Sequence, residues 1–243
     1  MLIGIGVVAV LCLVGVISAG GLLAASQNDS ADSTSNAQLQ QTLADRVRMT
    51  STSQAIGTST ARVKATQQGI LNQLESDKNL VYGPTSGELV HAEGESIIAQ
   101  EAGVNLRDFG LEAQFQNPYP ASEGAWDYGF LVRHETKNIH FRFVVQSDKK
   151  WVLINNNGDP NGETVAQGQI PALKTGANET NRVKLIFQGN RGWFFLNDNL
   201  ISELDLSARM NSGEIYIATG IFQKSKNPGA VTKYSDYSIW TLP

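Results

Sequence analysis

Pairs of acidic residues are the first place to look for chemistry in this sequence, because most glycosidases aim two carboxylates at one bond. Asp198, Glu203 and Asp205 lie close together around an expected hairpin. Asp198 falls in a turn and the other two flank a leucine, so we interpret all three as structural. Glu214 stands in an expected strand but has no second acid two positions on. The sequence therefore predicts no catalytic residues, and we expect the protein not to be an enzyme.

Metal and cofactor sites are not predicted either. The three histidines are scattered without the spacing of metal ligands: His91, His134 and His140. One loop alternates oxygen-bearing side chains that could face Ca²⁺, and we interpret it as a solvated turn: Asp159, Asn161 and Glu163. Cys12 is the only cysteine, so the chain can form neither an internal disulfide nor a cysteine-based metal site.

Carbohydrate is the ligand class that the remaining candidates indicate, in two opposite senses. Trp126, Tyr128 and Trp193 could stack on sugar rings if they are exposed, whereas aromatic residues at strand positions more often belong to the core. The chain could instead carry sugar, because Asn28 and Asn178 each begin an N-glycosylation sequon. An intact mass equal to that of the bare polypeptide would remove the second interpretation.

The charge balance excludes one class of partner. The 243 residues include 19 Lys and Arg against 23 Asp and Glu, which gives a net charge of −4. No stripe of basic residues is present to neutralise phosphates, so we expect no nucleic acid as a partner. The length leaves room for one anchor and one domain of ordinary size.

The first 25 residues form one uninterrupted apolar stretch without a charged side chain. As a helix, residues 2–25 would be about 36 Å long, enough to cross a hydrocarbon core of ~30 Å. We expect a long hydrophobic α-helix buried in lipid, in protein, or first in one and then in the other. No basic residue precedes the stretch, as a signal peptide would require. The expectation is either a mature N-terminus left by a prepilin-type peptidase or a plain N-terminal anchor.

This stretch resembles the N-terminus of an archaellin, the filament subunit of the archaellum and a relative of the type IV pilins. The resemblance covers about the first fifty residues and rests on Gly4-Ile5-Gly6, on Ser18-Ala19-Gly20-Gly21-Leu22-Leu23-Ala24-Ala25 and on Asn36-Ala37-Gln38-Leu39-Gln40-Gln41. It implies a helix that waits in the membrane as a monomer and then packs with many copies of itself in the core of a filament. The small residues favour close helix packing, although glycine is also common in membrane spans generally. The expected filament-core residues are Leu2, Ile3, Gly4, Ile5, Gly6, Val7, Val10, Leu13, Val14, Ile17 and Leu22.

Residues 26–80 predict a polar neck followed by a stalk helix. Residues 26–36 are small and polar, and apolar residues then recur at helical spacing from Leu39 to about Leu80. Met49, Ile56, Val63 and Ile70 are seven apart. The positions that would pair with them in a strong coiled coil are mostly polar. This segment either packs as a stalk on something else or covers the following domain.

Residues 81–243 predict an antiparallel β-sandwich, because a dozen short alternating runs follow one another between dense turn signals. The region resembles a concanavalin A-like, laminin-G-like jelly roll. The resembling residues are Trp126-Asp127-Tyr128-Gly129-Phe130-Leu131-Val132-Arg133, Phe141-Arg142-Phe143, Trp151, Trp193-Phe194-Phe195-Leu196-Asn197, Leu204-Asp205-Leu206, Gly213-Glu214-Ile215 and Tyr234-Ser235-Asp236-Tyr237-Ser238-Ile239-Trp240. In that family these positions mostly form core and hairpins, and many members bind glycans while some hydrolyse them.

The sequence as a whole predicts an α+β chain: a hydrophobic helix over 1–25, a neck and stalk helix over 26–80, and a jelly-roll β-sandwich over 81–243. The main functional prediction is a structural subunit of an extracellular filament serving motility or adhesion, with the sandwich as its outer sheath. The subunit would be membrane-inserted before assembly and require no cofactor. The alternative is a membrane-anchored, extracellular carbohydrate-binding module, and a weaker third is a sugar-processing enzyme.

Overall fold

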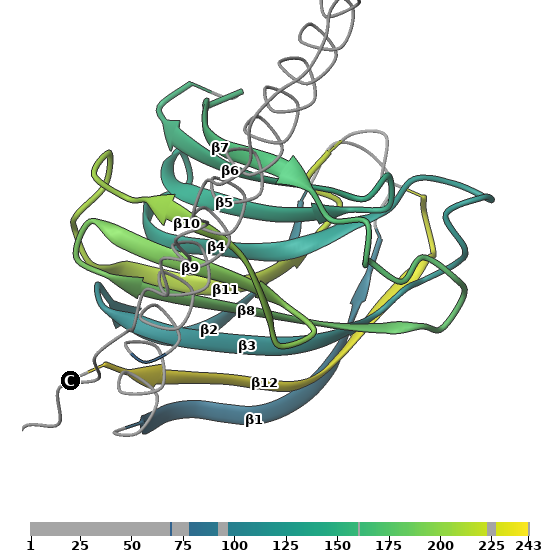
Figure 1. Cartoon of the computed structure of the whole chain (residues 1–243), viewed down its shortest axis with the longest axis horizontal. Helices are drawn as coiled ribbons and strands as arrows, with labels where there is room; N and C mark the ends of the chain where they lie inside the picture. Colours follow the sequence, from purple (N-terminus) through teal and green to yellow (C-terminus); the bar gives the residue numbers. More distant parts are fainter. Residues whose placement is uncertain (1–68, 70–77, 92–96, 160, 223–226, 243) are drawn as a thin grey trace, which may run out of the picture. The chain divides into compact units, whose positions relative to one another are not determined.

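The computed structural model describes residues 69, 78–91, 97–159, 161–222 and 227–242. Two compact units divide the chain at residues 64 and 65, and the described residues all lie in the second. They form two six-stranded antiparallel sheets (Figure 1). Sheet A has the order β1 (Asn79–Val90), β12 (Val231–Thr241), β3 (Phe109–Gln116), β8 (Thr180–Gln188), β9 (Arg191–Leu196) and β10 (Asn199–Asp205). Sheet B has the order β2 (Ile98–Leu106), β11 (Gly213–Thr219), β4 (Asp127–Thr136), β5 (Ile139–Gln146), β6 (Lys150–Asn157) and β7 (Glu163–Gln169).

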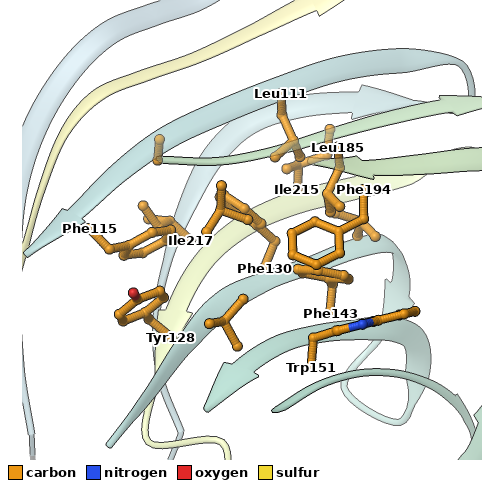
Figure 2. Packing of buried hydrophobic residues seen from close by; sticks show 14 of the residues in the cluster. Leu111, Phe115, Tyr128, Phe130, Phe143, Trp151, Leu185, Phe194, Ile215 and Ile217 are labelled. Atoms are coloured by element: carbon orange, nitrogen blue, oxygen red, sulfur yellow. The ribbon is translucent and has the colours of Figure 1, made fainter. Parts of the chain in front are cut away.

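The core lies between the two sheets and follows from alternation along the strands. In β3 the apolar side chains at 109, 111, 113 and 115 are buried, while the residues between them face the other way. Figure 2 shows Leu111, Phe115, Leu185 and Phe194 of sheet A opposite the buried side chains of sheet B, which include Tyr128, Phe130, Phe143, Trp151, Ile215 and Ile217. The predicted antiparallel jelly-roll sandwich in the C-terminal region is therefore confirmed.

The prediction of an α+β fold with a helical stalk is wrong for the part of the chain that the structure describes. That part is all-β, and Gly69 is the one described residue in helical conformation. The stalk was expected to run to Leu80, yet β1 begins at Asn79 and Leu80 is paired with Trp240 of β12. A helix with one apolar residue every seven positions buries little surface and gains little stability from packing. Pairing with a long neighbouring strand therefore stabilises the strand conformation more. The residues of the predicted filament-core helix lie outside the described residues, as does the rest of the predicted stalk.

Within the described residues no helix is both long and apolar enough to span a membrane.

Candidate binding groove

A groove of about 460 Å³ lies on the outer face of sheet A. It crosses the ends of four adjacent strands: β1, β12, β3 and β8. Its lining residues are mostly of polar type: Ser86, Gly87, Glu88, Gln114, Gln116, Thr180, Lys233, Tyr234 and Ser235. We call this feature the sheet A groove.

Strand register brings the polar side chains of the groove together. Gln116 of β3 is paired with Lys233 on one side and with Thr180 on the other. Gln114 is paired with Ser235, one step along the same strands. Because the neighbouring residues of β3 are core residues, its glutamines must point away from the core. Alternation in β3 therefore places two amides side by side in the groove.

Hydrogen bonds orient both amides. Gln114 donates through Nε2 to Oδ2 of Asp236 at 2.9 Å. Gln116 donates through Nε2 to Oδ1 of Asn178 at 3.2 Å. An amide has two N–H donors and a carbonyl acceptor, so each glutamine keeps one donor and its oxygen for a ligand. Paired donors and acceptors at fixed positions match the hydroxyl groups of a sugar.

The charges of the groove balance. Glu88 and Lys233 lie on paired positions, with Oε1 and Nζ 3.3 Å apart. Both side chains are more than half exposed, so this pair orients polar groups more than it stabilises the fold. The groove therefore suits a neutral, hydroxyl-rich ligand better than a strongly charged one.

The groove has no aromatic platform. Tyr234 is only 4% exposed, and its hydroxyl donates to Oε1 of Gln100 at 2.7 Å, across to the other sheet. Recognition there would depend on hydrogen bonds to hydroxyl groups and not on ring stacking.

The aromatic residues considered for glycan contact lie elsewhere. Trp126 and Tyr128 are 0% exposed and stack on each other in the core, with ring centroids 5.2 Å apart. Burial raises the pKa of Tyr128, and Asn181 donates to its hydroxyl at 3.0 Å. Trp193 is 3% exposed on the outer face of sheet A, and the guanidinium of Arg191 lies 5.3 Å from its ring centroid. None of the three presents an open ring face.

One predicted sequon borders the groove. Asn178 is exposed, has a positive φ of 59° and accepts the hydrogen bond from Gln116. Asn28 lies outside the described residues. Glycosylation at Asn178 stays a prediction, and a glycan there would stand beside the groove.

The acidic residues around the β9–β10 hairpin have structural partners. Asp198 lies 3.3 Å from Arg182, and Glu203 lies 3.4 Å from Arg191. The carboxylate of Asp205 accepts the backbone N–H of Ser207 at 2.9 Å, which lowers its pKa. Each of the three acids thus has a partner within the fold.

The predicted solvated turn is a local hydrogen-bonded turn. Oδ1 of Asp159 accepts the backbone N–H of Asn161 at 2.9 Å. Among the residues that the structure describes, no three acidic, histidine or cysteine side chains gather as metal ligands would.

Two of the three histidines are neighbours in space, which the sequence analysis missed. The rings of His134 and His140 stack with centroids 5.0 Å apart on the β4–β5 hairpin. Nε2 of His140 faces Nε of Arg142 at 3.1 Å. Burial, with the charge of Arg142 as the second cause, lowers the pKa of His140 to about 4. The short separation of His134 and His140 across an expected hairpin could have predicted that the two rings are neighbours.

His91 lies apart from this pair, in a buried hydrogen-bonded cluster. Its Nε2 is 3.0 Å from Oγ1 of Thr232 and 3.1 Å from Oγ1 of Thr219. The hydroxyl of Thr219 donates in turn to the carbonyl of Asp127 at 2.7 Å. This cluster joins three strands of both sheets, and its side chains are buried.

Comparisons with known proteins show the fold but no family. No family model matches the chain, and no curated protein matches it. A fructosyltransferase from A. japonicus aligns at a TM-score of 0.50 and 13% identity, over 70% of this chain and 27% of that one. The carbohydrate-binding module CBM66 from Bacillus subtilis aligns at 0.48 and 12%, over 67% and 92%. A Bacillus subtilis protein of unknown function with a galectin-like fold aligns at 0.48 and 13%, over 69% and 90%.

The chain thus spans about a quarter of the length of the fructosyltransferase that it matches. At this identity the likeness concerns the fold alone, a two-sheet jelly-roll sandwich.

Proposed function

We propose that this chain is a non-catalytic carbohydrate-binding module that works outside the cell and holds a neutral glycan in the sheet A groove. The observation that carries the proposal is the pair of amides at Gln114 and Gln116. Each is oriented by a protein acceptor and keeps further donor and acceptor capacity toward the groove. Fold alone does not establish a function, so the proposal depends on this site.

The chemistry of the groove supports a glycan more than other small ligands. Drug-sized apolar ligands prefer pockets lined by hydrophobic and aromatic side chains, and the largely buried Tyr234 is the one such residue that lines this groove. Glu88 and Lys233 cancel in charge, which disfavours phosphates and polyanions. A sandwich of this fold in a fructosyltransferase adds support from a protein that handles sugars.

Binding is tested with the full chain kept in mild detergent. Affinity electrophoresis through a panel of neutral and acidic polysaccharides finds the ligand, and calorimetry with its oligosaccharides gives the Kd. The double variant Gln114→Ala/Gln116→Ala should weaken binding at least tenfold, because it removes several hydrogen bonds worth about 1 kcal/mol each.

The matched control is Gln167→Ala/Gln169→Ala, which makes the same changes on exposed positions of β7 in the other sheet. This control should bind like the unmodified chain. Retardation by no polysaccharide, or equal binding by both double variants, would contradict the proposal.

The absence of catalysis is part of the proposal. The acids of the described β9–β10 hairpin are paired with arginines or with a backbone N–H group. Incubating the chain with the polysaccharide that it binds should release no reducing sugar, and release of sugar would identify an enzyme.

The filament function remains a prediction from residues 1–50, which lie outside the described residues. Nothing in the sandwich favours it over a binding module. Negative-stain electron microscopy of material sheared from the producing cells, with N-terminal sequencing of its main protein, distinguishes the two. Filaments built from this chain would establish the first, and their absence would leave the binding module.

A further inference from the structure

The outer face of sheet A is polar at one end and apolar at the other. At the apolar end, paired residues form a row across five strands: Leu80, Trp240, Gly110, Ile186 and Trp193. Phe195 follows Trp193 on the same face of β9 and packs with it and with Ile186. We call this set the apolar row. It lies on the face opposite the core, since Phe109 and Phe187 of the same strands point inward.

Apart from Leu80, which is 52% exposed, the apolar row is buried although it points away from the other sheet. Ile186 is 0% exposed, Trp240 1%, and Trp193 and Phe195 3% each. Sheet B packs against the opposite face, and no strand of the described residues crosses this one. Long cationic side chains lie over three rings at its margins, with Lys78 4.1 Å from Trp240, Lys184 4.7 Å from Phe195 and Arg191 5.3 Å from Trp193.

The chain enters the sandwich at one end of this row. Lys78 lies over Trp240, and Leu80 is the row's first residue. The compact unit that contains the sandwich begins at Ala65, so residues 65–77 belong to it. The segment 65–77 is therefore joined in sequence to Lys78, which lies at the apolar row, and belongs to the same compact unit.

We propose that residues 65–77 pack along the apolar row and cover it. The segment reads ATQQGILNQLESD and offers Ile70, Leu71 and Leu74 as apolar side chains. Its charged residues are Glu75 and Asp77, both acidic, while the side chains over the rings of the row are cationic. The segment and the apolar row are thus complementary in both their apolar and their charged groups.

The segment is long enough in any backbone conformation. From β12 to β9 the row spans three strand spacings, or roughly 14 Å. Thirteen residues cover about 20 Å even at the helical rise of 1.5 Å per residue, and more when extended. If nothing covered this face, the side chains of Ile186, Trp193, Phe195 and Trp240 would be open to water. Their low exposed fractions contradict that.

Site-specific photo-cross-linking of the full chain tests the proposal. With p-benzoylphenylalanine in place of Phe195, peptide mapping should find cross-links to residues 65–77. The same group in place of Gln167, on the other sheet, should give no cross-link to that segment. Mixing ¹⁵N-labelled and unlabelled chains before irradiation identifies cross-links between copies. Links between labelled and unlabelled chains would mean that a second copy covers the row, and links elsewhere or none would equally overturn the proposal.

A double variant gives an independent measurement. Ile70→Ser/Leu74→Ser should uncover Trp193 and Trp240, two of the four tryptophans, and raise the acrylamide quenching constant of the tryptophan fluorescence at least twofold. Gln68→Ser/Gln73→Ser changes the same segment without removing apolar side chains and should leave quenching unchanged. Equal quenching in both variants would contradict the proposal. If the first variant fails to fold, the cross-linking result decides alone.

Discussion

The indole of Trp240 occupies the space that a side chain at Gly110 would need. The two residues are paired across β12 and β3, and a Cβ added to Gly110 would lie 2.1 Å from Cε2 of Trp240. Gly110→Ala should therefore push the indole out of place and lower the free energy of unfolding by about 1–3 kcal/mol. Urea unfolding of the full chain measures the change. Gly69→Ala, where nothing lies within 4 Å of the added Cβ, is the matched control and should not lower the midpoint. Equal midpoints in the two variants would contradict this packing.

Arg133 ties three turns together from inside the sandwich. Its guanidinium is 0% exposed and donates to the carbonyls of Arg107 at 2.9 Å, of Gly189 at 2.8 Å and of Arg209. Burial lowers its pKa to about 10, so it stays protonated at neutral pH. Arg133→Met would leave these carbonyls without their donor, and we expect a loss of about 2–4 kcal/mol in the free energy of unfolding.

Arg182→Met is the matched control for Arg133. Arg182 is partly exposed and pairs with Asp198, itself 67% exposed, so its loss should cost less than about 1 kcal/mol. Urea titrations of both variants provide the comparison. If both lower the midpoint equally, the buried guanidinium is not what joins the turns.

Much of the sandwich could be predicted because its strands alternate. Tyr128, Phe130 and Val132 of β4 are two apart and all face the core, as a period of two requires. The same rule decides between core and ligand contact for Tyr128, and it puts Gln114 and Gln116 of β3 on the outer face. The outward orientation of these two glutamines in the candidate groove could therefore have been predicted from the sequence.

Irregular backbone limited the prediction elsewhere. The pairing of β4 and β5 shifts between Val132 and Thr136, and Arg133 has a positive φ of 46°. Such a bulge turns an arginine inward and brings His134 beside His140, and no residue type in the stretch signals it. The groove also depends on which strands become neighbours, since β1 and β12 are joined by pairing between the two ends of the domain. Local periodicity does not encode that pairing.

Asp127 holds the loop that follows β11. Its carboxylate is buried and accepts the backbone N–H groups of Ile221 at 3.0 Å and Phe222 at 2.9 Å. Asp127→Asn replaces one acceptor oxygen with a donor that faces an N–H group, so we expect a loss of about 1–3 kcal/mol. Hydrogen exchange of the amides of Ile221 and Phe222 should accelerate at least tenfold. Asp198→Asn, in an exposed turn, should leave their exchange unchanged. Unchanged exchange in Asp127→Asn would show that the carboxylate does not hold the loop.

His140 should make the fold sensitive to mild acid. Its folded pKa of about 4 lies below the ordinary value of 6.5, because burial and then the charge of Arg142 disfavour the protonated ring. Between these values the unfolded chain binds more protons, so the free energy of unfolding falls as pH falls from about 6.5 toward 4, by about 3 kcal/mol in all. Carboxylates with lowered pKa, such as Asp108, lose most of their contribution below their ordinary pKa of 3.8, which lies below the pH range measured here. Urea midpoints between pH 7 and 4.5 should decline steadily in the unmodified chain and in His134→Gln, which keeps both leading causes. His140→Gln should flatten the decline, and an equal slope in that variant would assign the acid sensitivity to another group.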